Sequence, residues 1–334
     1  MDKEELCNLI KNSNIVKEWH WFGYNFGFGD SDIYSRFGNA LVNSLLIIDE
    51  KINGYAKLMI EKIEGYSGKE NDIGHYEQLL QICGEIYVLT QAVHYFLNTT
   101  DVSFENEPTS STSKKNPEFV INFKGYKYGI EVKLPSLVDH ISKRKKNEFQ
   151  LIGRRQGFLD YFKNISANKK VTLPRDNPVK DFMESANNKF HGFKKDSTKF
   201  ISILFILWDD FINEPIGALR TKPSGLLLED SFAKKDGETM KFQNVDYIFL
   251  DRPLTNFIED AAGRSLIDNK LNSFDYGSIE DFPHKIMVKN PHAKSSFIHQ
   301  EILDCFQVKE LSPLLGAEYN PLDLIIWIDS KNPK

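Results

Sequence analysis

The chain has 334 residues, of which 41% are hydrophobic, so it is long enough to bury one large core or two smaller ones. A formal net charge of −5 argues against a general polyanion binder, and no apolar run approaches the roughly 20 residues of a membrane span. The acidic N-terminus is unlike a secretory signal peptide. Three well-separated cysteines, Cys7, Cys83 and Cys305, exclude a four-cysteine iron–sulfur cluster and indicate a reducing cytoplasm.

Residues 1–70 are expected to be helical, particularly residues 32–63, because their apolar positions recur at helical spacing. An aromatic and glycine-rich stretch at residues 19–30 is interpreted as a packed loop, with a partner surface or base-stacking surface as the alternative. Its glycines lack the preceding strand, the following helix and the lysine that a phosphate-binding loop requires.

A long helix is predicted over residues 72–98, where apolar side chains again follow helical spacing. Between Glu77 and Asp101 the only formally charged side chain is Glu85. An unpaired charge in apolar surroundings is costly, so Glu85 is expected to have a partner such as a basic group or a metal-bound water. The alternative is a glutamate at the edge of the helix that reaches solvent.

Three strands are predicted next, at residues 101–105, 117–123 and 126–133, with an exposed loop over residues 106–116 and a Gly-containing turn between the last two. Side chains alternate across a strand, so Glu131 and Lys133 share one face while Val132 takes the other. A hairpin would carry Glu118 to the same edge of the sheet as Glu131. Two carboxylates beside a lysine suit a Mg²⁺-dependent phosphodiesterase, in which carboxylates hold the cation and the ammonium orients the attacking water.

Further along the chain, a helix is predicted at residues 177–192 and a strand buried on both faces at residues 200–208. Residues 210–240 are interpreted as loop-rich, residues 245–250 as a strand, and residues 251–334 as alternating helix and strand. Acid-x-Lys triplets also begin at Asp49, Asp268 and Asp329. The triplet at Asp329 follows an apolar strand pattern, but the Glu131 triplet is the one with helices and strands on both sides.

The combination of Pro117-Glu118 with Glu131-Val132-Lys133 resembles the PD-(D/E)xK nuclease superfamily, over roughly residues 75–210. One departure is that Glu118 stands where the family usually has Asp. The resemblance implies an α/β, restriction-endonuclease-like fold with a mixed central sheet flanked by helices. It implies Mg²⁺, with Mn²⁺ as a substitute, held by Glu118, Glu131 and the carbonyl of Val132. It further implies that Lys133 positions the water and that Glu85 acts as an outer ligand or water anchor.

The domain organisation expected from these patterns has three parts. Residues 1–70 form a helical N-terminal region, residues 71–250 the nuclease-like core with a basic helical insertion, and residues 251–334 a mixed C-terminal extension. Charge is unevenly distributed, because residues 114–199 hold 20 Lys or Arg against 9 Asp or Glu, while the remainder holds 22 against 38. This asymmetry indicates a basic face that meets phosphate. The candidate nucleic-acid contacts are Lys143, Arg144, Lys145, Lys146, Arg154, Arg155 and Lys189, with a solvated helix face as the alternative.

The sequence therefore predicts a metal-dependent nuclease, in particular a DNA endonuclease of restriction or anti-phage defence type, by analogy with the family. A homodimer is expected because one site per chain cuts one strand of a duplex, and a partner protein of a defence system is a further expectation. Two alternatives stay open. The first is a catalytically inactive nucleic-acid-binding module on the same fold, which the Glu118 departure favours. The second is a protein-interaction scaffold whose basic segment is merely solvated.

Overall fold

The computed structural model of the chain describes residues 1–26, 35–112, 115–136, 140, 146, 149–150, 171–209, 212–266, 270–276, 285–295, 297–311 and 328–329. The helices of at least six residues are α1 (Lys3–Asn12), α3 (Trp21–Phe26), α4 (Arg36–Lys51), α5 (Tyr55–Glu64), α6 (Ile73–Tyr95), α9 (Asp176–Asp196), α10 (Asn213–Arg220), α11 (Leu254–Ala261) and α12 (Gln300–Phe306), and α2 (Asn14–Lys17) is a single turn. Within these ranges no helix is both long enough and apolar enough to cross a bilayer.

A seven-stranded mixed sheet lies at the centre, with strand order β1-β2-β3-β6-β9-β10-β11. Its strands are β1 (Val102–Asn106), β2 (Phe119–Phe123), β3 (Tyr126–Lys133), β6 (Phe200–Leu207), β9 (Tyr247–Asp251), β10 (Ile286–Lys289) and β11 (Lys309–Glu310). The central strands β3, β6 and β9 run parallel to one another. The pairs β1–β2, β2–β3 and β9–β10 are antiparallel, and β10–β11 is parallel. The expected α/β class with a mixed sheet flanked by helices is therefore confirmed.

Two smaller sheets lie outside this central one. The first joins β4 (Phe149–Gln150), β5 (Val171–Thr172) and β12 (Ile328–Asp329), and the second is the pair β7 (Lys234–Lys235) and β8 (Glu238–Thr239). β4 and β5 belong to the segment predicted as a basic helical insertion, most of which lies outside the described residues.

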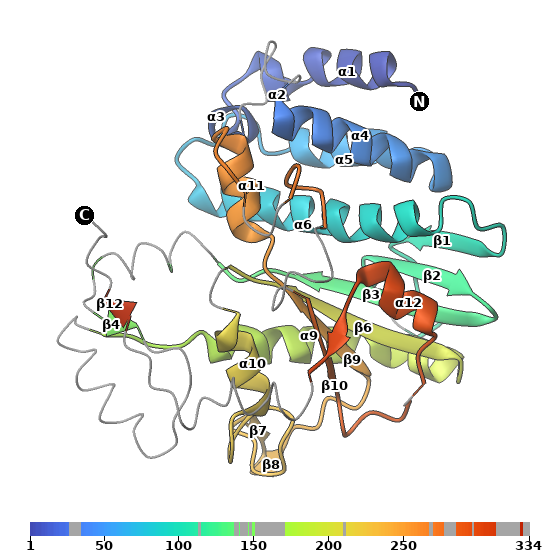
Figure 1. The fold of residues 1–334 in the computed structure, drawn as a ribbon, viewed down its shortest axis with the longest axis vertical. Coiled ribbons are helices and arrows are strands. Elements are labelled where there is room, and N and C mark those ends of the chain that lie inside the picture. Colours follow the sequence, from blue (N-terminus) through green and yellow to red (C-terminus); the bar gives the residue numbers. More distant parts are fainter. Residues whose placement is uncertain are drawn as a thin grey trace.

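The sheet separates two apolar cores (Figure 1). All eight residues of β6 are buried, as expected for a strand covered on both faces. Ile203 and Phe205 face the core that contains α4, α5 and α6, whereas Leu204 and Ile206 face the core that contains α9 and α10. The two faces alternate because successive side chains of a strand point in opposite directions.

Helix α6 has 23 residues and is buried almost continuously from Leu79 to Val93. A helix that is apolar on all sides requires cover on all sides. The N-terminal helices provide it on one side and the sheet on the other, so α6 lies between two layers (Figure 1). Gly84 permits the close approach to the sheet, because a Cβ there would lie 2.8 Å from side-chain atoms of both Leu134 and Leu207.

The β2–β3 hairpin forms as the sequence predicts. Its turn residues Lys124 and Gly125 both have positive φ angles, 49° and 75°, as the favoured two-residue hairpin turn requires. The register pairs Phe119 with Ile130, and Glu118 N donates to Ile130 O at 2.9 Å. If the same register is extended by one residue beyond the Phe119–Ile130 pair, Glu118 lies opposite Glu131.

One local expectation is wrong. Residues 21–26 form α3 rather than a loop, because aromatic packing outweighs the glycines: Phe22 packs on Phe37 and Trp21 on Tyr76. The loop-rich stretch at 210–240 contains α10, whose residues include the buried Ile216. The described part of residues 251–334 includes β10 and β11, which belong to the central sheet. The division of the chain at residues 70 and 250 stays a prediction.

Candidate active site

The end of β3 positions two of the predicted residues on one face of the sheet. Val132 belongs to the apolar core on the α6 side, so Glu131 and Lys133 point toward α9. Glu131 is fully buried and pairs in register with Leu204 of the neighbouring β6. Lys133 is only partly buried, because it is the last residue of the strand.

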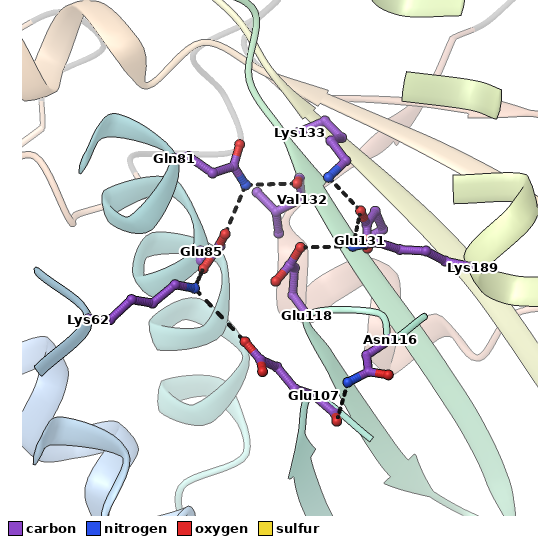
Figure 2. A network of polar contacts seen from close by, with 10 residues as sticks. All are labelled: Lys62, Gln81, Glu85, Glu107, Asn116, Glu118, Glu131, Val132, Lys133 and Lys189. Atoms are coloured by element: carbon purple, nitrogen blue, oxygen red, sulfur yellow. Dashed lines mark hydrogen bonds and ion pairs between the residues drawn. The ribbon is translucent and has the colours of Figure 1, made fainter. Parts of the chain in front are cut away.

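Two ammonium groups hold the Glu131 carboxylate (Figure 2). The Nζ atoms of Lys133 and Lys189 each lie 2.7 Å from Glu131 Oε1. This oxygen is buried, and both ammonium groups offset its charge. Lys189 donates to Glu131 Oε2 at 2.9 Å and to Glu118 Oε1 at 3.4 Å. Lys189, predicted as a phosphate contact, thus lies between the two carboxylates that are expected to bind metal.

Helix α6 contributes a second carboxylate group from the opposite side (Figure 2). Gln81 Nε2 donates to the Val132 carbonyl at 2.9 Å and to Glu85 Oε1 at 3.0 Å. Lys62 of α5 donates to Glu85 Oε2 at 3.1 Å and lies 3.9 Å from Glu107. Glu85 therefore has a basic partner, as expected, and Gln81 links it to the end of β3.

Sequence reasoning missed both Gln81 and Lys62. Gln81 precedes Glu85 by four residues, so the two share one face of α6, and this spacing is a signal that was available. Lys62 carried no such signal, because it reaches the site from a helix of the N-terminal layer.

The electrostatics of the site centre on Glu118. Burial raises the pKa of Glu118 to about 7, with further contributions from the negative charges of Glu85 and Glu131 that Lys189 and Lys133 only partly offset. Burial would lower the pKa of Lys189, but Glu131 and Glu118 outweigh it and raise that pKa. Glu118 is therefore a carboxylate that lacks full charge compensation, whereas Lys189 stays protonated.

A cavity of about 410 Å³ opens beside these groups, between α6 and the segment that follows β3. Its lining includes Lys62, Gln81, Glu85, Glu118, Lys133 and Ser136. Ser136 Oγ donates to Glu77 Oε1 at 2.5 Å, so this segment is anchored to α6. Polar and charged groups from three separate elements thus converge on one space that a ligand can enter.

The donor set fits a hard divalent cation. Glu131 Oε1 is a buried anionic oxygen without a hydrogen bond, and Glu118 lies beside it. Among the described residues, no group of three or more His, Cys, Asp or Glu side chains is arranged to hold a metal ion. Mg²⁺ in proteins is commonly bound by one or two carboxylates together with water and substrate oxygens, and the carboxylates of Glu118 and Glu131 are groups of that kind.

Most of the predicted nucleic-acid contacts lie outside the described residues, namely Lys143, Arg144, Lys145, Arg154 and Arg155. Lys146 is described and is exposed. Of the competing triplets, Asp329 belongs to β12, which pairs with β4 and is no part of the central sheet. Asp49 is buried, accepts from Ala56 N and pairs with the N-terminal ammonium. Asp268 lies outside the described residues.

A second buried ionic cluster lies at the same edge of the sheet, beyond the end of β6. Arg175 donates through Nε to Glu214 at 2.7 Å and through Nη2 to Asp209 at 2.9 Å. Trp208 Nε1 donates to Glu214 at 3.1 Å, and the guanidinium lies 4.5 Å from the centroid of the Trp208 ring system. Burial raises the pKa of Glu214 to about 7 although Arg175 opposes this.

Comparison with known proteins adds no further identification. No protein-family model, no curated protein and no solved structure matched the chain.

Proposed function

We propose that the protein is a Mg²⁺-dependent nuclease that hydrolyses phosphodiester bonds, with DNA as its substrate. The observation that carries this proposal is the convergence of Glu118, Glu131 and Lys133 at the end of a hairpin beside an open cavity. These residues are distant from the N-terminal layer in sequence, yet Lys62 from that layer completes the polar network.

In this proposal the carboxylates of Glu118 and Glu131, with the Val132 carbonyl, hold the cation. A bound Mg²⁺ supplies Lewis-acid activation of the phosphate and of the attacking water. The chain's own contribution is positional. Lys133 presents an ammonium at the cavity to orient water, while Gln81 and Lys62 hold Glu85 at the opposite wall, where it can anchor a second water.

Lys189 must share Glu118 and Glu131 with any such cation, since its ammonium contacts both carboxylates. The two positive charges compete for the same oxygens. Lys189 offsets part of the negative charge of these two carboxylates, which would be costly to bury without a partner.

The test is cleavage of supercoiled plasmid, single-stranded DNA and RNA in Mg²⁺, Mn²⁺ or EDTA. Glu131→Gln keeps the shape of the side chain but removes its charge, and Lys133→Ala removes the ammonium. Each is expected to lower the cleavage rate by about 10³-fold, the scale on which loss of one charge-stabilising group acts. Lys127→Ala is the matched control, because Lys127 lies on the same strand, is exposed and pairs only with the surface residue Glu105 among the described residues.

Circular dichroism should show that all three variants are folded. Cleavage at the native rate by both Glu131→Gln and Lys133→Ala would remove these residues from the mechanism and overturn the assignment.

A second candidate is a nucleic-acid-binding module that does not hydrolyse its ligand. It is favoured by one observation, that two lysines already neutralise Glu131. The same experiment separates the two functions. Salt-sensitive DNA binding without cleavage in any metal would support the binding module.

A further inference from the structure

A second cavity, of about 540 Å³, lies at the opposite edge of the sheet from Lys133, near the start of β6. Phe200 lines this cavity, and Leu204 of the same strand, β6, is the register partner of Glu131. The two β6 residues are four positions apart, which corresponds to about 13 Å along the strand. The cavity is therefore separate from the candidate active site, although both lie against α9. Its basic lining residues are His191, Lys194, Lys195 and Lys294, and hydroxyl and amide side chains complete the wall.

The positive charges come from two segments that are about a hundred residues apart in sequence. Lysines in the last turn of a helix complement its dipole, which accounts for Lys194 and Lys195 as residues of α9. That argument does not apply to Lys294, which follows β10 and reaches the same cavity. Within the described part of the chain, neither Lys195 nor Lys294 forms an ion pair, and both are exposed.

Polar side chains of the cavity are held in place by contacts with buried residues. Lys194 is largely buried and forms an ion pair with Asp246, a fully buried carboxylate that also accepts from Ser202 N at 2.8 Å. On the wall, Asn244 is oriented by Asn187, which accepts from Asn244 N at 3.0 Å through its side chain and from Asn244 Nδ2 at 3.1 Å through its carbonyl. The polar groups are therefore held in place before any ligand arrives.

The clustering of like charges has a cost that a ligand would relieve. Burial lowers the pKa of Lys194, Asp246 opposes this, and the nearby charge of Lys294 lowers it further. One carboxylate, Asp246, offsets one ammonium, so Lys195 and Lys294 leave an excess of positive charge around a space in the usual size range of small-molecule sites.

We propose that this cavity, lined by Lys194, Lys195, Lys294 and His191, is a binding site for a phosphate group. Lys195 and Lys294 contact the phosphate oxygens, His191 and the hydroxyls of Ser197 and Thr198 add hydrogen bonds, and Lys194 supplies a fixed positive floor. The phosphate belongs either to a free phosphorylated small molecule or to the backbone of a nucleic acid. This proposal does not rest on the nuclease function, because it concerns different residues and needs no metal.

The test is calorimetric titration of the full-length protein in EDTA with inorganic phosphate, a 5′-mononucleotide and a ten-residue oligothymidylate. The double variant Lys195→Gln, Lys294→Gln is expected to bind about tenfold or more weakly, since two charge-assisted hydrogen bonds are lost. Lys180→Gln is the control, because Lys180 is on the same helix but lies outside the cavity lining. Both substituted lysines are exposed, and urea unfolding verifies that the double variant is folded.

The three probes distinguish the source of the phosphate. Lysine-dependent binding of inorganic phosphate and the mononucleotide identifies a small-molecule site, and lysine-dependent binding of the oligonucleotide alone identifies a backbone contact. The proposal is overturned if no probe binds, or if the double variant binds each probe as the native protein does.

Discussion

The two buried ionic clusters at one edge of the sheet contain similar groups but differ in what surrounds them. Around Glu131, three glutamates meet three lysines, and Glu85, Glu118 and Lys133 line a cavity. Around Arg175, two carboxylates share one guanidinium that is packed against Trp208, and none of these groups lines that cavity. One cluster is open to a ligand, and the other is enclosed by the protein.

A raised carboxyl pKa does not distinguish the two clusters. The pKa of Glu118 and that of Glu214 are both about 7, and in both cases burial is the largest cause. Perturbed pKa values therefore indicate buried charge first, and a reactive site only when access and convergent groups accompany them. Only the cluster at Glu131 combines a raised carboxyl pKa with groups that line a cavity, which is why the proposed chemistry is placed there and not at Arg175.

Among the variants that test this comparison, Arg175→Met is expected to have the largest effect, which is on the free energy of unfolding. Removal of the guanidinium leaves Asp209 and Glu214 buried without their shared partner, which should lower the free energy of unfolding by about 3–5 kcal/mol. Cleavage per folded molecule should be unchanged. Urea unfolding and nuclease assays at low temperature measure the two quantities, with the exposed Arg220→Met as the control. A loss of activity in the folded fraction would show that the enclosed cluster also takes part in the chemistry.

Glu214→Gln tests the same cluster through pH. The folded-state pKa of Glu214 is raised from 4.5 to about 7, so protonation stabilises the folded state. This contribution is fully present below pH 4.5 and is lost as pH rises through 7, by up to about 3 kcal/mol. The free energy of unfolding of the native protein should therefore fall relative to that of Glu214→Gln as the pH rises from 5 to 8.

Urea unfolding at each pH measures that difference. Glu229→Gln serves as the reference, since the Glu229 side chain is 77% exposed, and its curve should run parallel to the native one. Parallel curves for Glu214→Gln as well would mean that Glu214 is ionised equally in the folded and unfolded states.

Lys189→Met addresses the open cluster and carries the smallest expected effect. Loss of the Lys189 ammonium removes a positive charge that competes with a divalent cation for Glu118 and Glu131, although Lys133 still contacts Glu131, so Mn²⁺ affinity should rise about tenfold. Titration followed by electron paramagnetic resonance measures the free metal directly. Lys180→Met on the same helix should leave the affinity unchanged. Equal affinity in Lys189→Met and the native protein would place the cation away from these two carboxylates.

The sequence by itself determined the local geometry of the candidate site. Alternation along a strand set Glu131 and Lys133 on one face, the turn at Gly125 made a hairpin, and the hairpin carried Glu118 to the same edge. Helical spacing likewise located α6 and identified Glu85 as the charge within its buried part, and the unbroken apolar run of β6 indicated a central strand. These features depend on residues that are close together in the sequence, so the periodicity of apolar and polar positions predicts them.

Only the tertiary structure decided which distant residues meet. Lys62 reaches Glu85 because α5 packs over α6, Lys189 enters between Glu118 and Glu131 because α9 crosses β3, and Lys294 joins the second cavity from beyond β10. A local pattern shows which side of an element is apolar, but it does not state which element will cover that side. Partners across the sheet are selected by packing of the whole core, and for that reason Lys62 and Lys189 could not be identified in advance as counter-charges of Glu85 and Glu131.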